Sequence, residues 1–460
     1  MPPSPTYRSS TRHADLGAAF YDVVEPAAFP LHRLRHRNQR WAARVGLDTL
    51  GNEEWIAHFG RFEPLPGSFE RPLALRYHGH QFRTYNPFLG DGRGFLFAQL
   101  HDAEDGRLLD LGTKGSGRTP WSRGADGRLT LKGGVRELLA SEMLEALGVD
   151  TSKTFSLIET GEALARHDEP SPTRSAVLVR LSHSHLRIGT FQRFAYHEDT
   201  ASLRRLLDHA VRTYLPDAWR ADEAARVVTF LERVAAAVAR TGARWMAAGF
   251  VHGVLNTDNI NITGESFDYG PWRFLPTCDS GFTAAYFDET GLYSYGRQPA
   301  TLAWNLTRLA ECLLPLAASQ AELEAALNTF QPAFQKELAT AVRERLGLRS
   351  AGPARDLALM TVLFDFLETT RAPFERTFFD WRCGSRSEGR ARRSPAAPLY
   401  ASPAFAPVRA ALEGFEPAAT ADVGLAHPYF ARAEPCTMLI EEVEAIWARI
   451  ADADDWSLLA

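Results

Sequence analysis

The chain has 460 residues, of which 45% are hydrophobic and 23% are charged, and its formal net charge is −5. This composition excludes a disordered chain, and the negative charge argues against a general nucleic-acid-binding protein. The length predicts two or three packed subdomains rather than a single core.

Cysteine usage and hydropathy limit the cellular compartments in which the protein is expected. The chain has no apolar run of the about 18 residues that a membrane-spanning helix needs, so we expect no membrane association. The N-terminus lacks the apolar core of a secretory signal, although its Ser and Arg residues leave a transit peptide as an alternative. The scattered cysteines form no CxxC pair, which predicts a reduced, cytoplasmic protein without a zinc site and leaves one long-range disulfide open. They are Cys278, Cys312, Cys383 and Cys436.

The first 200 residues are predicted to hold the β-structure. Residues 1–70 mix helical signals such as "LHRLRHRNQRWAARVGL" with Pro breaks, and we expect them to pack as an extension on the core. Residues 71–200 are expected to form a smaller lobe. There "GFLFAQL" and "RLLDLGTKG" flank an Asp105-Gly106 turn signal, which predicts a hairpin. A helix in "KGGVRELLASEMLEALGV" and a strand in "SAVLVRLS" are predicted to follow.

The rest of the chain is predicted to be mostly helical. Within residues 201–383, "DEAARVVTFLERVAAAVARTGARWMAAGF" is the longest helix candidate, ending at Gly249, and "TLAWNLTRLAECLLPL" is a second, ending at Pro315. Residues 384–460 are expected to form a loop, exposed over 384–407 because of its Pro, Ser and Arg content, and then a C-terminal helix. The predicted fold is α+β and bilobal, with a β-containing N-terminal lobe and a larger helical lobe.

The text "FLGDGRGFLFAQL" carries alternating glycines, Gly90, Gly92 and Gly94, with Arg93 between the last two. It does not open a helix as a dinucleotide fingerprint does, and it lacks the Gly-Lys-Ser/Thr ending of a P-loop. A Gly-rich hairpin that lays backbone N–H groups over phosphates fits the pattern. A plain tight turn fits it as well.

A lysine and a glutamate have the spacing used in kinase-like sites. Lys114 ends a predicted strand, and Glu137 lies on the predicted helix that follows. A strand lysine paired with a helix glutamate orients nucleotide phosphates in such sites, whereas two unrelated surface charges are the alternative. Between them, Asp126-Gly127 suits a ligand contact or a bend.

Two arginines bracket the end of the next predicted strand in "VRLSHSHLRIGTF". Arg180 and Arg187 are suited to bidentate recognition of phosphate oxygens. His183 and His185 between them have no acidic or cysteine neighbour in the sequence, so structural histidines are favoured over a metal site.

The segment "VHGVLNTDNINITGESFDYG" resembles the catalytic and metal loop of small-molecule kinases. Asn259 and Asp268 stand where such enzymes place two oxygen ligands for Mg²⁺. The position of the usual catalytic acid is Val254, and Asp258 is the carboxylate placed to replace it. The alternative is an Asx-rich turn between strands.

Taken in order, these motifs resemble the selenoprotein O (SelO, also called YdiU) family of pseudokinases. The matching text covers about residues 70 to 316 densely and extends more thinly to both ends. It comprises "LRYHGHQF", "NPFLGDGRG", "LGTKGSGRTPWSR", "VRELLASEMLEALGV", "SHLRIGTF", "HGVLNTDNI", "DYGPWRFL" and "QPATLAWNLTRLA".

The resemblance implies a protein-kinase-like fold and a protein adenylyltransferase. Such an enzyme binds ATP in an inverted orientation, moves AMP to a Ser, Thr or Tyr hydroxyl of a protein and releases pyrophosphate. It also implies Mg²⁺ or Mn²⁺ as cofactor, protein substrates as partners and a monomer. The matching positions imply Asp258 as proton acceptor, Asn259 and Asp268 as metal ligands, Glu137 as the partner of Lys114, and Gly90, Gly92, Arg93, Lys114, Asp126, Gly127, Arg180, Arg187 and Asp268 as nucleotide-binding residues.

The chain also departs from the family pattern. Ala125 and the Arg83-Thr84 pair replace residues usual in the family, and the ending "DDWSLLA" has no Cys. A redox switch through the C-terminus is therefore not expected, and Cys278 with Cys436 is the pairing to test. Ordinary phosphoryl transfer and a nucleotide-binding scaffold without turnover are the alternative functions. Val254 argues against the first and the intact metal-ligand positions argue against the second.

Overall fold

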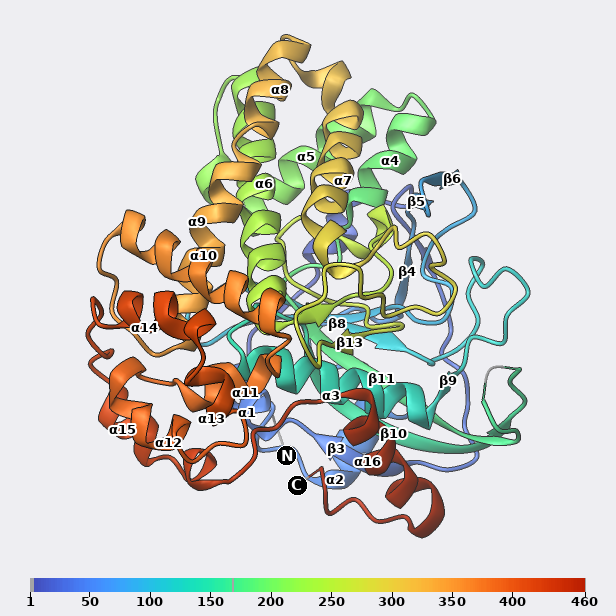
Figure 1. The fold of residues 1–460 in the computed structure, drawn as a ribbon. Coiled ribbons are helices and arrows are strands. Elements are labelled where there is room, and N and C mark those ends of the chain that lie inside the picture. Colours follow the sequence, from blue (N-terminus) through green and yellow to red (C-terminus); the bar gives the residue numbers. More distant parts are fainter. Residues whose placement is uncertain (1–3, 168, 460) are drawn as a thin grey trace.

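The computed structural model describes residues 4–167 and 169–459. Most of the strands gather in one lobe, and a bundle of helices forms most of the other (Figure 1). This arrangement confirms the predicted α+β fold with a β-containing N-terminal lobe and a larger helical C-terminal lobe.

The N-terminal lobe is built on an antiparallel sheet of nine strands among the described residues. Its main path runs β2-β4-β7-β8-β11-β10-β3, while β1 pairs with β7 and β9 pairs with β11. The strands are β1 (Ser9–Ser10), β2 (Tyr21–Val23), β3 (Arg33–Arg37), β4 (Leu73–Leu75), β7 (Leu96–His101), β8 (Leu108–Lys114), β9 (Leu129–Thr130), β10 (Lys153–Leu164) and β11 (Thr173–Ser182).

Both faces of this sheet are covered, so its central strands β7, β8 and β11 are buried along almost their whole length. Along β11, Leu178 belongs to the core cluster under helix α3 (Leu131–Ala146), whereas Val177 and Val179 belong to the cluster on the opposite face. Successive side chains of a strand point to opposite faces, so both clusters draw on one strand. The helices α1 (Gln39–Arg44) and α2 (Asn52–Phe59) supply the second cluster.

The predicted hairpin and helix of this lobe are present. Strands β7 and β8 pair antiparallel, and Gly106 in their turn has φ of +76°. Helix α3 begins after Thr130, whose side chain accepts the N–H of Gly133, and Gly148 follows its end with φ of +80°.

The C-terminal lobe is arranged around α6 (Glu223–Ala248), the longest helix described. Asp222 caps its start by accepting the N–H of Ala225, and Gly249 ends it in the left-handed region, as the sequence predicts. The other helices of this lobe are α4 (Ile188–Tyr196), α5 (Thr200–Tyr214), α7 (Gln298–Leu313), α8 (Gln320–Leu327), α9 (Phe330–Arg345), α10 (Pro353–Thr370), α11 (Phe374–Asp380), α12 (Glu388–Ala391), α13 (Ala397–Tyr400), α14 (Ala406–Leu412) and α15 (Ala421–Ala426), and α16 (Ile440–Ala453) follows them in the chain.

Two further pairs of short strands lie outside the main sheet. Strands β5 (Gly79–Gln81) and β6 (Thr84–Asn86) form a separate hairpin, and β12 (Phe250–Val251) pairs with β13 (Arg273–Phe274). No helix among the described residues combines the length and apolar character needed to cross a membrane.

The prediction of an exposed loop over residues 384–407 is wrong. The segment folds into short helical pieces, and Tyr400 and Phe405 are buried against Phe366 and Trp381. Three of its four prolines, Pro398, Pro403 and Pro407, occupy first-turn positions of these pieces, where a missing N–H costs nothing. Proline content therefore marked helix starts here rather than an open linker.

Residues 1–70 take part in the main sheet. The segment "LHRLRHRNQRWAARVGL" forms strand β3 first, paired with β10, and becomes helical only after Asn38, whose side chain accepts the N–H of Trp41. The far end of the chain packs on the same lobe, because α16 contacts α3. The Glu444 carboxylate lies 2.8 Å from the Lys132 ammonium there.

Candidate active site

The Lys114 ammonium and the Glu137 carboxylate are hydrogen-bonded to one another. Lys114 is the last residue of β8, and Glu137 lies on the face of α3 that packs against the sheet. Both side chains are buried. The strand–helix pair expected from the sequence is thus in contact.

Asp268 lies at the centre of a group of three cations. Its Oδ1 accepts from Lys114 Nζ at 3.1 Å and from an Arg180 guanidinium nitrogen at 3.2 Å, and its Oδ2 accepts from Arg187 at 3.3 Å. Burial raises the pKa of Asp268, but the charges of Lys114, Arg180, Arg187 and Arg93 outweigh that effect and hold it well below its usual range. Asp268 therefore stays ionised.

Strand pairing and helix capping position the two arginines. Arg180 lies on β11 opposite Gly112 of β8, two residues from Lys114. Arg187 stands at the start of α4, and its guanidinium lies over the rings of Tyr77 and Phe267 at 4.5 and 4.8 Å. Both side chains are almost fully buried. Three buried cationic side chains that converge on one place offer several N–H donors, which suit the oxygens of a polyphosphate.

Asp258 has a contrasting environment. It lies in a short 3-10 turn, Thr257–Asn259, and its buried Oδ1 has no hydrogen-bond partner within the described part of the chain. Burial raises the pKa of Asp258 to about 7, although Arg187 opposes the shift. Gly79 packs directly against it, since a Cβ at Gly79 would lie 2.9 Å from Asp258 Oδ1. A carboxylate with this pKa, one of whose oxygens accepts no hydrogen bond, is suited to take up a proton.

Arg187 joins these two carboxylate sites. One of its guanidinium nitrogens donates to the Asp258 carbonyl oxygen at 2.8 Å and to Asp268 Oδ2 at 3.3 Å. A ligand that displaces the Arg187 guanidinium would therefore break its hydrogen bonds to both Asp258 and Asp268.

Asn259 directly follows Asp258 and is half-buried. Its amide nitrogen donates to the Val254 carbonyl oxygen at 3.0 Å, which turns the amide oxygen to the other side. Val254, at the position of the usual catalytic acid, packs against the main hydrophobic core. His252 is buried and hydrogen-bonds the Phe267 carbonyl oxygen at 3.0 Å.

The Gly-rich loop lies against the loop that follows β8. A Cβ on Gly90 or on Gly92 would come within 3 Å of Trp121. The hydroxyls of Thr119 and Ser122 each donate at 2.5 Å, to the carbonyl oxygens of Asp91 and Gly92 respectively. These two glycines are therefore required by close packing, and the two loops form one unit.

Asp126 and Gly127 lie away from the group around Asp268. The Asp126 carboxylate is partly exposed and pairs with Arg166 at 2.7 Å. Gly127 accepts the N–H of Gly117, three residues after Lys114. Arg93 is exposed, and its charge contributes to the low pKa of Asp268. The structure thus groups Lys114 and Glu137 with the arginines, while the Asp126-Gly127 turn is bonded to the loop that follows Lys114.

The sequence analysis assigned no role to Asp91 or to Asn256. Asp91 accepts the N–H of Leu75 at 3.0 Å and lies 3.5 Å from Arg187, so it connects the Gly-rich loop to the charged group. Asn256 Oδ1 accepts from Tyr293 at 2.8 Å and from the N–H of Phe82 at 3.1 Å. The signal for Asp91 was its place between two glycines of the quoted motif.

The two histidines near this site lie close to acidic residues. His185 is buried and its Nδ1 lies 3.5 Å from Asp110 Oδ2, and the N–H of His183 donates to Glu265. No group of three or more His, Cys, Asp or Glu side chains in the described residues has a geometry that could hold a metal ion. Cys278 and Cys436 are both free thiols, and burial raises the pKa of Cys278 to about 11.

A strand lysine bonded to a helix glutamate, with an asparagine and an aspartate on following loops, is an arrangement typical of kinase-like proteins. Sequence comparison identifies which kinase-like group this is. The family profile described as "Protein adenylyltransferase SelO" matches residues 5–460, and the chain belongs to that family.

Curated relatives agree with this assignment. The chain is 46% identical over 457 residues to "Protein nucleotidyltransferase YdiU" of Gloeobacter violaceus, covering 96% of this chain and 91% of the relative. It is 51% identical over 343 residues to the protein of the same name from Synechocystis sp., covering 73% and 70% of the two chains. The chain is therefore a nucleotidyltransferase of the protein adenylyltransferase type, for which ATP is the substrate and proteins are acceptors.

A structural comparison matched a solved chain described as ROP2 from Toxoplasma gondii, a virulence factor with a protein-kinase fold and no enzymatic activity. The identity is 12%, the TM-score is 0.28, and the match covers 79% of this chain and 97% of that one. With so low a TM-score, it carries no weight here.

Proposed function

We propose that Asp258 accepts the proton of a Ser, Thr or Tyr hydroxyl while AMP passes from ATP to that oxygen. Lys114, Arg180 and Arg187 then hold the β- and γ-phosphates, so ATP lies inverted relative to its orientation in kinases. This places the α-phosphate nearest to Asp258.

In this reaction one bond to the α-phosphorus forms and one breaks. The acceptor oxygen forms a bond to the α-phosphorus, and the bond from that phosphorus to the bridging oxygen of the β-phosphate breaks. Pyrophosphate leaves with the electron pair, and the hydroxyl proton moves to Asp258. Such transfers depend on positioning and charge neutralisation, which the buried cations provide.

One observation carries this proposal: Arg187 contacts both the Asp258 backbone and the Asp268 carboxylate. A phosphate held by Arg187 would therefore lie between a carboxylate suited to proton uptake and one that stays ionised. The raised pKa of Asp258 and the lowered pKa of Asp268 support these different tasks.

Asn259 and Asp268 are proposed to hold a magnesium or manganese ion, which would take the place of Lys114, Arg180 or Arg187 on the Asp268 oxygens. They offer an amide oxygen and a carboxylate, which are the hard ligands such cations prefer, and the Asn259 nitrogen is already engaged by Val254. Two protein ligands suffice, because Mg²⁺ is held in large part by substrate phosphates and water. When bound, the cation would neutralise phosphate charge. Removal of divalent cations by EDTA should therefore abolish transfer, and added Mg²⁺ or Mn²⁺ should restore it.

The remaining family positions are proposed as nucleotide contacts. Gly90 and Gly92 are proposed to bring backbone N–H groups close to phosphates, in a loop that packs against Trp121. Arg93, Asp126 and Gly127 would contact the nucleotide nearby. For Asp126 this requires release from Arg166, since the two side chains pair at 2.7 Å.

The labelled phosphate distinguishes this reaction from the alternatives. Purified protein is incubated with α-³²P-ATP or γ-³²P-ATP and Mg²⁺, beside an Asp268→Ala control. Protein-bound label from the α-position alone supports AMP transfer. Label from the γ-position alone would make the chain a kinase despite Val254, and label unaffected by Asp268→Ala would refute the proposed site. A scaffold would bind ATP and retain no label in either case.

We also propose that the protein is a cytoplasmic monomer. The cytoplasmic location is supported by the four cysteines, which are free thiols, as expected of a reducing compartment. Light scattering during size exclusion tests the oligomeric state, and cell fractionation tests the location.

A further inference from the structure

Three exposed aromatic side chains lie together beside the loop that carries Asp258. The exposed fractions of Phe82, Tyr286 and Phe287 are 38%, 89% and 45%. The ring centroids of Phe82 and Phe287 are 5.8 Å apart, and those of Phe287 and Tyr286 are 5.2 Å apart. Single exposed apolar residues are common, whereas a contiguous group points to an interaction surface. We call these three residues the aromatic rim.

The rim is tied to the catalytic loop by hydrogen bonds. The N–H of Phe82 donates to Asn256 Oδ1 at 3.1 Å, and the N–H of His80 donates to Thr257 Oγ1 at 2.7 Å. Asn256 and Thr257 immediately precede Asp258. A polypeptide that brings a hydroxyl to Asp258 would therefore meet the rim next.

Phe82 is held in place at some conformational cost. It forms the two-residue turn between β5 and β6 with Arg83, and both residues have positive φ, +49° and +65°. Such turns favour Asn-Gly, so a Phe-Arg pair there is strained. Tyr293, a buried residue whose hydroxyl also accepts the Phe82 N–H at 3.1 Å, packs under the Phe82 ring.

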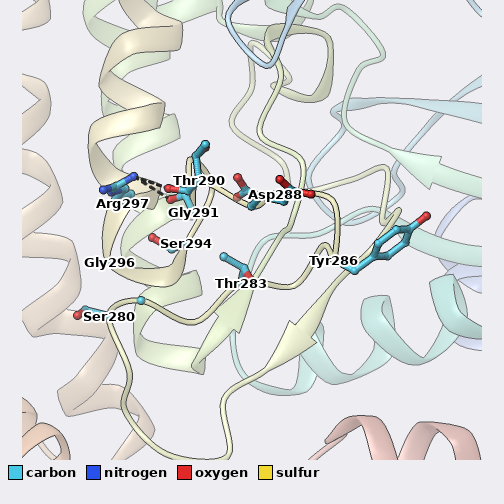
Figure 2. A pocket seen from close by; sticks show the side chains of 11 residues that line it. Ser280, Thr283, Tyr286, Asp288, Thr290, Gly291, Ser294, Gly296 and Arg297 are labelled. Atoms are coloured by element: carbon cyan, nitrogen blue, oxygen red, sulfur yellow. Dashed lines mark hydrogen bonds between the residues drawn. The ribbon is translucent and has the colours of Figure 1, made fainter.

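The other half of the rim sits on a loop that is well braced. Both Asp288 carboxylate oxygens accept backbone N–H groups, those of Leu292 and Tyr293, at 2.8 Å. Arg297 donates to the Thr290 carbonyl oxygen at 3.0 Å. Figure 2 shows the Tyr286 ring pointing away from Asp288 and Arg297. A braced loop that exposes aromatic rings loses little conformational entropy when a partner binds.

We propose that the aromatic rim docks the acceptor segment of protein substrates through an apolar side chain adjacent to the acceptor hydroxyl. This inference rests on the proposed function. The partner is a polypeptide because proteins are the acceptors of this family. The adjacent side chain is apolar because the rim offers ring faces rather than charges, and aromatic residues are the usual anchors of protein contacts.

Two peptide mixtures test the proposal. Both have Ser, Thr or Tyr at the centre, flanked by Leu and Phe in one mixture and by Asn and Gly, which carry no hydroxyl, in the other. With α-³²P-ATP, the protein should label the Leu/Phe mixture with a KM about tenfold lower. Equal KM values for the two mixtures would overturn the proposal.

Variants assign any preference to the rim. The double change Tyr286→Ser/Phe287→Ser should remove the preference for the Leu/Phe mixture and leave the KM for ATP unchanged. Adding Phe82→Ser to this variant should not restore the preference. Leu357→Ala, on α10 with a side chain 41% exposed, is the control and should retain the preference. A preference that survives the double change would overturn the proposal.

The outcomes separate this inference from the proposed function. If the protein labels itself from α-³²P-ATP but labels neither mixture, the docking proposal fails and AMP transfer stands. If no α-label is retained on any protein or peptide, the proposed function itself fails.

Discussion

Asp258 and Asp268 lie ten residues apart on one segment, yet their surroundings are opposite. Asp268 is bonded to three cations and its pKa is held low, whereas Asp258 has an unpartnered buried oxygen and a pKa raised to about 7. The same side-chain chemistry is thus prepared for charge in one place and for proton transfer in the other. The comparison teaches that the neighbours of a carboxylate, rather than its position in a motif, decide its task.

Asp268→Asn should have the largest effect. It leaves three buried cations without their shared anion, so we expect the free energy of unfolding to fall by about 3 kcal/mol and AMP transfer to fall about 10³- to 10⁴-fold. Denaturant unfolding and α-³²P labelling measure the two effects. Asp279→Asn, which affects a partly exposed pair with Arg371, is the matched control. An Asp268 variant as stable as this control would show that the cations do not depend on the carboxylate.

Asp258→Asn should separate activity from stability. Transfer should fall about 10²- to 10³-fold, while calorimetry should show ATP binding unchanged. Because burial raises the pKa from 3.8 to about 7, the folded state loses stability as pH rises through this interval. The variant should therefore unfold like the wild type below pH 3.8, then gain on it up to about pH 7. A variant less stable than the wild type at pH 8 would contradict the contrast with Asp268.

Glu137→Gln should have an intermediate effect. It weakens the hold on Lys114 but leaves the 3.1 Å contact between Lys114 and Asp268. We expect the KM for ATP to rise and transfer to fall by about 10- to 100-fold through misplacement of the lysine. Glu142→Gln on the same helix is the control for helix stability. Equal activity of the two variants would show that Lys114 needs no orienting partner.

Glu444→Ala should have the smallest effect. Glu444 on α16 pairs with Lys132 and lies 3.8 Å from Arg136, the neighbour of Glu137 on α3. A partly exposed pair contributes about 0.5–1 kcal/mol, so only a slight loss of stability is expected. Thermal unfolding beside Glu441→Ala checks this. A loss of transfer as large as that of Glu137→Gln would mean that α16 sets the position of α3.

Local patterns allowed much of this site to be predicted. A Lys at a strand end and a Glu at helical spacing on the next helix are features of neighbouring elements, so Lys114 and Glu137 could be paired from the sequence. The environments of Asp258 and Asp268 could not be read in this way, because the groups that decide them come from distant strands and loops. Gly79 against Asp258 and Arg180 against Asp268 are examples.

The two elements that were predicted wrongly also depend on contacts with distant parts of the chain. The Pro-rich stretch over residues 384–407 was predicted to be a loop, because proline at a helix start and proline in a linker look alike until the helix finds a packing partner. Likewise, Arg33–Arg37 is a strand because β10 pairs with it, although its own residues gave a helical signal.

The packing of α16 on the N-terminal lobe orders the protein's assembly in time. The last strand of the main sheet ends at Ser182, but Asp454, which binds Arg35 and Arg174 of that sheet, is synthesised about 270 residues later. At roughly 5–20 residues per second, the ribosome needs about 15 to 55 s to make this stretch. Throughout that interval the nascent sheet lacks this contact, so the lobe that carries Lys114 reaches its finished form only after Asp454 has been made.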